Sequence, residues 1–343
     1  MLSRYISFAT IALLFGIIIP CDGYALSYRA GDFNFKLSGY GTAGFIEPDF
    51  DKPDFVGDFS VRGEVAYRSS EKQTFGLVYA YDEDALHEDD WKSDAFGYWY
   101  WRGIGRIELG FTESVAHKLG LGLPDVGGLR LNDDSLVYRK MGVDGPVIAN
   151  TVVTTDSDAL HLNIVSASNP HTQYGLSVSG LTDEYDAAVD LGFKLRYSEG
   201  KTKYALSLAA SFMNNLDKYS TDTFTPDTTA DWRGQFAAGL NIQYNSLVFA
   251  LTGRIIYDEN PIGVATDGFV IGTGASYDLL NYTLSLSYLF SDTGVWHHDF
   301  DNYIDNTVVG SFRYKYSEYV DGWTSIGVSR KNPFLAVGLR ATF

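Results

Sequence analysis

Cysteine is nearly absent from this chain, which contains a single residue of this type, Cys21. Residues 1–25 carry one basic residue, then the apolar run 11–19, then small residues before Ala25, a pattern typical of a cleaved secretory signal peptide. Bulky residues precede Cys21, which disfavours a lipoprotein signal. Cleavage after Ala25 would leave a mature domain, 26–343, without a thiol, so we expect no disulfide and no cysteine nucleophile or cysteine metal site.

Long hydrophobic runs are also missing beyond the signal peptide, and the run 11–19 is itself shorter than the roughly 20 residues that span a bilayer. A helical membrane protein is therefore excluded. The mean hydropathy is −0.09, yet 15% of the residues are aromatic, with 24 Tyr and 22 Phe. A transmembrane β-barrel reconciles these values, because its strands turn only every second residue to lipid and collect aromatic residues at both interfaces.

Positive charge is scarce: 26 Lys and Arg stand against 43 Asp and Glu, a formal net charge of −17. This balance argues against a nucleic-acid partner. Nucleophile-elbow, phosphate-loop and zinc-helix motifs are absent, and His297-His298 with Asp299 matches no metal-ligand spacing. We therefore expect no enzyme activity, no metal and no cofactor.

Apolar and polar residues alternate along most of the mature chain, as in strands with one apolar face. In 187–197, for example, Val189, Leu191 and Phe193 face away from Asp190 and Lys194. The pattern predicts about 16 strands, each of roughly ten residues. They lie near 33–46, 57–68, 73–81, 95–102, 106–112, 158–166, 173–180, 187–197, 202–212, 232–244, 247–257, 268–277, 282–290, 306–316, 321–330 and 333–343.

Short and long connections alternate along the chain, as expected for an antiparallel up-and-down barrel with short periplasmic turns and long external loops. A soluble sandwich has no reason to sort its loops in this way. The final strand ends on an aromatic residue, Phe343, which is typical of bacterial outer-membrane barrels. We expect the bacterial outer membrane as the location, with membrane lipid and lipopolysaccharide as partners.

Three segments carry a family resemblance: the hairpin from Ala95 to Gly110, Pro124-Asp125-Val126-Gly127-Gly128, and Tyr138-Arg139. With them, essentially the whole mature sequence resembles the general diffusion porins of Gram-negative outer membranes. The resemblance implies a homotrimer of 16-stranded barrels in which the third loop, 113–157, folds into the pore. This sequence departs from the family at two positions. An acidic residue is expected near Leu121, and a basic residue is expected near Asp94.

The resemblance implies a pore constriction in which acidic residues of the loop oppose basic residues of the wall. Asp125 would be the acidic element, with Arg62 and Arg139 on the basic side. The constriction candidates are Asp125, Arg62, Arg139, Glu64, Asp133 and Asp134. The length of loop 113–157, about 45 residues, and its apolar stretch 119–124 independently favour packing against an inner wall.

Lumen-facing basic residues gather toward the predicted periplasmic ends of the strands, whereas most acidic residues lie in external loops. This arrangement predicts an axial field that depends on ionic strength. The residues of this basic collar are Lys36, Arg106, Lys194, Arg196, Arg313 and Arg340.

The function that we expect is a water-filled channel for passive diffusion of small hydrophilic solutes and ions. Two alternatives stay open. One is a closed barrel that acts as an adhesin or structural protein. The other is a carbohydrate-selective channel, because Tyr98 and Tyr100 have lumen parity. The sequence identifies neither the preferred solutes nor the width of the pore.

Overall fold

The computed structural model describes most of the chain after the predicted signal peptide. The signal-peptide residues 1–25, including Cys21, lie outside the described residues. The described ranges are 26–48, 53–84, 91–124, 151–153, 159–166, 169, 171–180, 187–216, 230–259, 265–292, 304–329 and 332–343.

Strands make up almost all of the secondary structure in these ranges. Among the described residues, no helix has the length and apolar character needed to cross a bilayer. The elements are β1 Leu26–Ala30, β2 Phe33–Pro48, β3 Asp54–Arg68, β4 Gln73–Asp84, β5 Trp91–Trp101, β6 Gly105–Phe111, α2 Val115–Leu119, β7 Leu160–Ser166, β8 Thr172–Gly180, β9 Ala187–Glu199, β10 Thr202–Leu216, β11 Ala230–Tyr244, β12 Leu247–Glu259, β13 Ala265–Leu279, β14 Tyr282–Asp292, β15 Ile304–Lys315, β16 Val320–Ser329 and β17 Asn332–Thr342.

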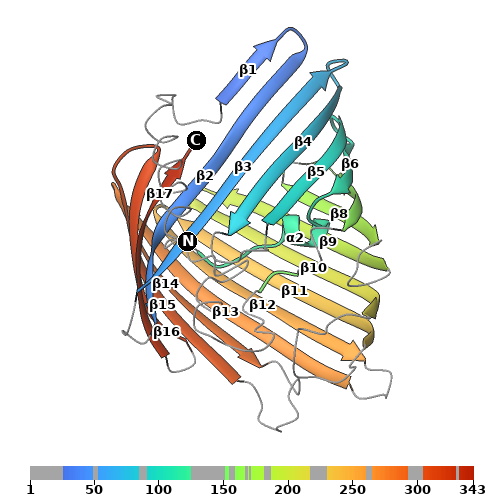
Figure 1. Cartoon of the computed structure of the whole chain (residues 1–343). Coiled ribbons are helices and arrows are strands. Elements are labelled where there is room, and N and C mark those ends of the chain that lie inside the picture. The colour runs from blue at the N-terminus through green and yellow to red at the C-terminus, as the bar shows by residue number, and fades with distance from the viewer. Residues whose placement is uncertain are drawn as a thin grey trace.

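The strands β2 to β17 form a closed barrel (Figure 1). Each strand pairs antiparallel with the next along the chain, as β9 does with β10. The barrel closes where β17 pairs antiparallel with β2, from Phe334 opposite Pro48 to Thr342 opposite Tyr40. A closed ring leaves no unpaired sheet edge, which is what a strand structure needs inside a bilayer. The predicted 16-stranded up-and-down barrel is thus confirmed.

The strand β1 is an addition that the alternation did not predict. Phe343, which directly follows β17, exchanges two backbone hydrogen bonds with Gly39 of β2, at 2.9 and 3.0 Å. Just beyond this point, β1 takes over the same edge of β2, with Leu26 opposite Leu37. The hairpin between them turns at Gly31, whose φ of +63° is accessible to glycine without strain. The five residues of β1 are too few for the alternation of apolar and polar residues to indicate a strand.

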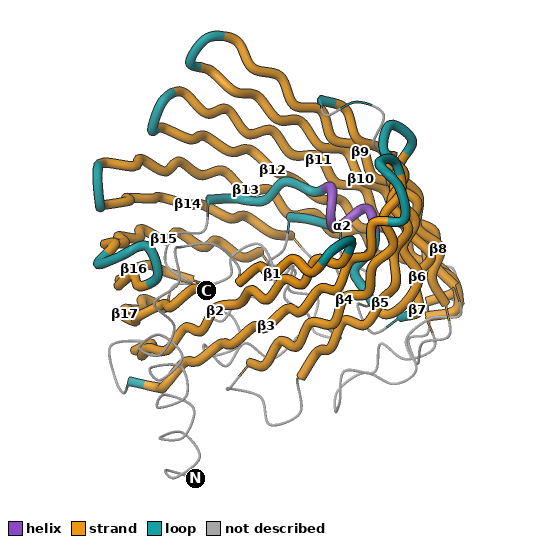
Figure 2. The backbone as a smooth tube through the Cα atoms, turned by 90° about the horizontal axis from the view of Figure 1, so that it is seen from above, coloured by secondary structure: helices purple, strands orange, loops and turns teal. Residues whose placement is uncertain are grey.

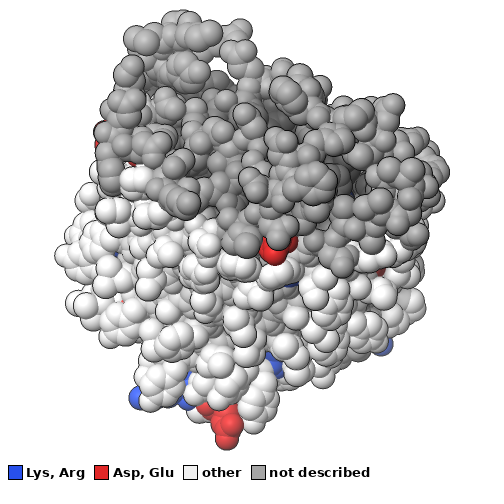
Figure 3. All heavy atoms as spheres, turned by 90° about the horizontal axis from the view of Figure 1, so that it is seen from below, with Lys and Arg blue, Asp and Glu red and all other residues white. Residues whose placement is uncertain are grey.

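The outer face of the barrel is apolar. On β10, Leu206, Leu208 and Phe212 are exposed, and the strands beside it show the same outward pattern. Aromatic rings gather into stacks such as Phe75, Trp99 and Trp101, with centroids 6.0 and 5.8 Å apart. Figure 3 shows a described surface with almost no Lys, Arg, Asp or Glu across its middle. Such a face belongs in lipid, and the aromatic stacks suit the interfaces.

The inner face carries mostly small or polar side chains, in alternation with the outer residues. On β10 these are Ser207, Ala209, Ser211 and Met213, all buried. Burial inside a ring of this size requires that something lie against the wall. Part of the connection after β6 does so, as described below. Figure 2 shows α2, the first element of that connection, inside the ring beside β9 and β10.

Candidate functional site: the inner wall and the segment it carries

The predicted constriction residues divide into two groups. Arg62 and Glu64 lie on the inner face of β3. Their immediate neighbours in sequence, Val61 and Val65, face outward. Asp125, Asp133, Asp134 and Arg139 lie outside the described residues. The structure therefore places the wall side of the predicted constriction and leaves the loop side as a prediction.

The ring of Phe96 on β5 is the centre of a charged cluster on this wall. Three cationic groups lie over it: the guanidinium of Arg62 at 5.6 Å from the ring centroid, that of Arg106 at 5.8 Å, and the Nζ of Lys118 at 5.0 Å. Two of these residues come from strands and Lys118 from α2. The aromatic face attracts each cation and keeps the three close together despite their mutual repulsion.

Glu108 on β6 neutralises part of this charge. It is 5% exposed. Its Oε1 lies 2.8 Å from Arg106 Nε, and its Oε2 lies 2.5 Å from Lys118 Nζ. Asn163 on β7 donates from Nδ2 to the same Oε2 at 3.1 Å. A buried carboxylate is tolerated only with such partners, so Glu108 ties α2 to the wall.

This pairing adds a partner to a residue predicted for the basic collar. The structure places Arg106 in the charged cluster, paired with Glu108. The alternation of residues correctly places Arg106 on the inner face, but it does not identify Glu108 as its partner. Glu108, Asn163 and Lys118 were not predicted as site residues. The inward parity of Glu108 was the available signal.

Tyr98 joins the cluster from the next inward position of β5. Its hydroxyl donates to Glu64 Oε1 at 2.6 Å, and the guanidinium of Arg106 lies 4.0 Å from its ring centroid. The ring therefore serves as a support for charged groups. A sugar-stacking platform would need an open ring face toward the lumen, so this arrangement disfavours the carbohydrate-track alternative at Tyr98.

The short helix α2 is fixed at both ends by its sequence. Ser114 Oγ accepts a hydrogen bond from His117 N at 3.3 Å and caps the N-terminus, and Gly120 ends the helix by donating to His117 O at 3.0 Å. Val115 N also donates to Ser177 Oγ on β8, at 2.6 Å. Val115, Ala116 and Leu119 are buried against the inner faces of β8, β9 and β10.

Glycines on the inner face make room for this helix. A Cβ atom built on Gly175 of β8 would lie 2.6 Å from Val115 Cγ1, and one on Gly192 of β9 would lie 2.7 Å from Val115 O. Such distances are shorter than real contacts of a Cβ atom. Any larger residue at Gly192 would push α2 off the wall, and one at Gly175 would also meet Ile164 O of β7 at 2.6 Å.

The same relation continues along the segment after the helix. A Cβ at Gly239 of β11 would meet Leu121 at 2.8 Å, one at Gly272 of β13 would meet Leu123 at 2.9 Å, and one at Gly274 would meet Pro124 at 3.0 Å. Ser287 on β14 then donates to Pro124 O at 3.4 Å. Residues 115–124 thus run around the inner wall from β8 to β14. We call the five glycines, Gly175, Gly192, Gly239, Gly272 and Gly274, the glycine track.

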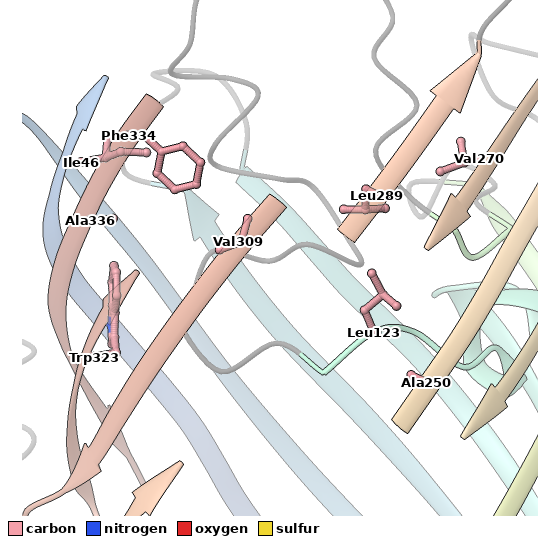
Figure 4. Packing of buried hydrophobic residues seen from close by; sticks show 9 residues of the cluster. All are labelled: Ile46, Leu123, Ala250, Val270, Leu289, Val309, Trp323, Phe334 and Ala336. Atoms are coloured by element: carbon pink, nitrogen blue, oxygen red, sulfur yellow. The ribbon is translucent and has the colours of Figure 1, made fainter. Parts of the chain in front are cut away.

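An apolar surface begins where the described segment stops. Leu123 belongs to a buried cluster of inward-facing side chains (Figure 4). The other members come from β12 to β17 and β2: Ala250, Val270, Leu289, Val309, Trp323, Phe334, Ala336 and Ile46. A wall in contact with water alone would not favour such a surface.

The remaining collar residues also have inward parity, at the end of the barrel where the turns are short. Lys194 on β9 donates to Gly120 O at 3.4 Å, and Arg196 donates to Gln173 Oε1 at 3.3 Å. Lys36 lies on the part of β2 that pairs with β1, beyond the end of β17. Arg313 and Arg340 belong to another group, considered below. Within the described ranges, no three His, Cys, Asp or Glu residues are grouped to hold a metal ion.

Comparisons with known proteins gave structural matches only. No family model matches the sequence, and no curated protein sequence matches it. OmpF of Salmonella typhi, solved in complex with daunomycin, is 10% identical with a TM-score of 0.65, covering 93% of this chain and 100% of that chain. The trimer form of OmpT from Vibrio cholerae is 10% identical with a TM-score of 0.66, covering 91% and 99% of the two chains.

An anion-selective porin from Comamonas acidovorans is also 10% identical, with a TM-score of 0.60 over 91% of this chain and 100% of that chain. At such identities the likeness concerns the fold. The chain therefore has the 16-stranded barrel fold of the general porins, in agreement with the resemblance seen in the sequence. What it does must be argued from its own inner wall.

Proposed function

We propose that this protein is a porin of the bacterial outer membrane: a water-filled channel through which small hydrophilic solutes and ions diffuse passively, without enzyme activity. The observation that carries the proposal is the closed barrel whose outer face is apolar and whose inner face bears charged and small polar side chains. A bilayer fits the first face and water the second. The polar inner face also supports a channel over a closed barrel for adhesion.

We propose further that loop 113–157 narrows this channel. Residues 115–124 on the glycine track support this, since they lie against the inner wall from β8 to β14. The apolar cluster around Leu123 extends the argument, because we expect the loop residues that follow Pro124 to cover it. In this proposal Asp125 opposes Arg62 across the gap, with Glu64, Asp133, Asp134 and Arg139 nearby. Opposed charges in a narrow, poorly hydrated gap would orient dipolar solutes.

Assembly and processing complete the proposal. We infer a homotrimer, surrounded by lipid and lipopolysaccharide, after signal-peptide cleavage behind Ala25. The outward-facing small residues Gly39, Gly41 and Ala43 of β2 support close approach of a neighbouring barrel. The trimer form of the similar OmpT structure is consistent with this arrangement.

A planar-bilayer recording of the purified mature protein tests the proposal. We expect stepwise, ohmic conductance in about three coupled levels per insertion, since a barrel this size can hold an aqueous lumen. Mass spectrometry should find a chain that begins at Leu26. Insertion without conductance would overturn the channel. Single-level steps together with a monomeric mass in mild detergent would overturn only the trimer.

A further inference from the structure

A second group of charged residues lies on the inner face at the short-turn end of the barrel. Arg313 and Lys315 stand on β15, Asp321 on β16 and Arg340 on β17. In the strand register Lys315 is opposite Asp321, and Asp321 is opposite Arg340. We call these four residues the β15–β17 cluster. It is separate from the charged cluster around Phe96.

Positive charge is in excess within this cluster. Asp321 interacts electrostatically with Arg313, Arg340 and Lys315. None of these three cations has a carboxylate oxygen within 4.0 Å among the described residues. A second acid, Asp278 on β13, is linked to Arg313 through Thr283, whose Oγ1 donates a hydrogen bond to it at 2.6 Å. Three cations held close together repel one another, so an anion placed between them would be attracted.

Hydrogen-bond donors without partners lie within and beside this cluster. The Nε atoms of Arg313 and Arg340 and the indole Nε1 of Trp323 are buried and have no hydrogen-bond partner in the described chain, and the same holds for one acceptor of the cluster, Asp321 Oδ1. Trp323 lies opposite Arg313 in the register and is 3% exposed. Buried donors are normally satisfied, by protein, by water or by a ligand. A ligand rich in acceptor oxygens would satisfy them.

Both arginines are also held in position. Arg313 donates from Nη2 to Thr283 Oγ1 at 3.1 Å. The guanidinium of Arg340 lies 4.7 Å from the ring centroid of Tyr40 on β2, across the seam that closes the barrel. Such supports reduce the conformational entropy that the side chains lose when they bind a ligand.

We propose that the β15–β17 cluster is an anion subsite for the phosphate group of a solute in the lumen. A phosphate group presents three terminal oxygens, which suits three separate cationic side chains better than the two oxygens of a carboxylate, and arginine is well suited to it. This subsite rests on the proposed channel in the sense that solutes reach it through the lumen. Phosphate-bearing solutes would then dwell at this end of the pore.

Two measurements with inorganic phosphate test the subsite. Calorimetric titration of the protein in detergent measures binding directly, and bilayer conductance in constant KCl, with phosphate added on one side, measures dwell in the pore. We expect saturable binding and a saturable decrease of KCl conductance. Arg340→Gln and Arg313→Gln should each weaken phosphate binding about tenfold or more, from the loss of charge-assisted hydrogen bonds.

The matched control is Arg102→Gln, which removes an exposed arginine from the short turn between β5 and β6. It should leave phosphate binding unchanged. Acetate serves as the carboxylate probe and should bind more weakly than phosphate. The change in gel mobility between unheated and heated samples confirms that each variant is a folded barrel. If Arg340→Gln does not fold, Arg340→Lys replaces it, because this variant keeps the positive charge.

The outcomes separate the subsite from the channel. Ohmic conductance with no saturable phosphate binding, or with equal binding in all variants, overturns the subsite and leaves the channel. Equal binding of acetate overturns the phosphate assignment. Saturable, arginine-dependent phosphate binding without conductance supports the subsite and overturns the channel.

Discussion

The barrel has two unlike inner walls. The packing wall, β8 to β14, is built around the glycine track and carries residues 115–124. The charged wall, β15 to β17 with β2 to β6, carries aromatic rings and basic side chains that face one another. The comparison teaches that parity alone does not define a pore lining. Inward-facing residues of the packing wall contact residues 115–124, whereas those of the charged wall include charged groups as well as part of the apolar cluster around Leu123.

Charged residues illustrate this difference. On the packing wall Arg254, 4% exposed, donates to Val152 O at 2.8 Å, and Lys194 donates to Gly120 O. Both therefore bind backbone carbonyls of the connection between β6 and β7. On the charged wall Arg62 and Arg340 lie over rings, at 5.6 and 4.7 Å from the centroids of Phe96 and Tyr40. We expect substitutions on the packing wall to change conductance and those on the charged wall to change selectivity.

The largest effect is expected for Gly192→Leu on the packing wall. The new side chain would overlap Val115 and destabilise the docked segment by about 1–3 kcal/mol. Single-channel conductance should rise, because the segment no longer holds to the wall. Gly310→Leu is the control, since a Cβ there meets only Ile326 O, at 3.8 Å. A folded Gly192→Leu barrel with wild-type conductance would contradict the packing role.

Glu108→Gln should have the next largest effect, because it breaks the link between the two walls. Loss of the carboxylate leaves Arg106 and Lys118 without their shared partner and adds net positive charge to the lumen. Reversal potentials under a salt gradient should shift toward anion selectivity. Glu71→Gln, in an exposed turn, should leave them unchanged. An unshifted reversal potential in Glu108→Gln would place this cluster outside the conducting path.

Smaller and opposite shifts are expected from the two sides of the proposed constriction. Arg62→Gln removes a cation from the charged wall and should move selectivity toward cations. Asp125→Asn removes the proposed loop acid and should move it toward anions. Both shifts should shrink as salt shortens the Debye length from about 30 Å at 0.01 M to about 3 Å at 1 M. Shifts of the same sign would mean that Asp125 and Arg62 do not oppose each other.

The smallest effect is expected for Tyr98→Phe, which removes only the hydrogen bond to Glu64. A double-mutant cycle with Glu64→Gln, followed by urea unfolding, should give a coupling free energy near the lower end of about 1.5–3 kcal/mol, because Glu64 is partly solvated. Additive effects would show that this hydrogen bond contributes nothing to stability.

The barrel could be predicted from the sequence because its information is local. A period of two over ten residues, as in β10 from Tyr204 to Phe212, gives the strand and its two faces. The strand β1 could not be predicted in this way, because Leu26–Ala30 is short and its pairing depends on where β17 ends. The up-and-down topology could also be predicted, because the alternation of short and long connections is visible along the sequence.

The site was predictable only in part. Parity placed Arg62, Glu64 and Arg106 on the inner face, but their partners come from other strands and from α2. The contact between Glu108 and Lys118 depends on how the segment folds back onto the wall. The glycine track had a visible signal, namely inward parity at Gly192 and Gly239. Its meaning needed the segment that fills it.

The most direct test of a water-filled lumen uses neighbouring residues of β3 with opposite parity. The predicted mature chain contains no cysteine. Arg62→Cys and Val61→Cys each introduce a single thiol, on the inner and the outer face respectively. Bilayer conductance is recorded while a charged, water-soluble thiol reagent is added. We predict a stepwise change for Arg62→Cys and none for Val61→Cys. Unchanged conductance in a labelled Arg62→Cys channel would contradict the account.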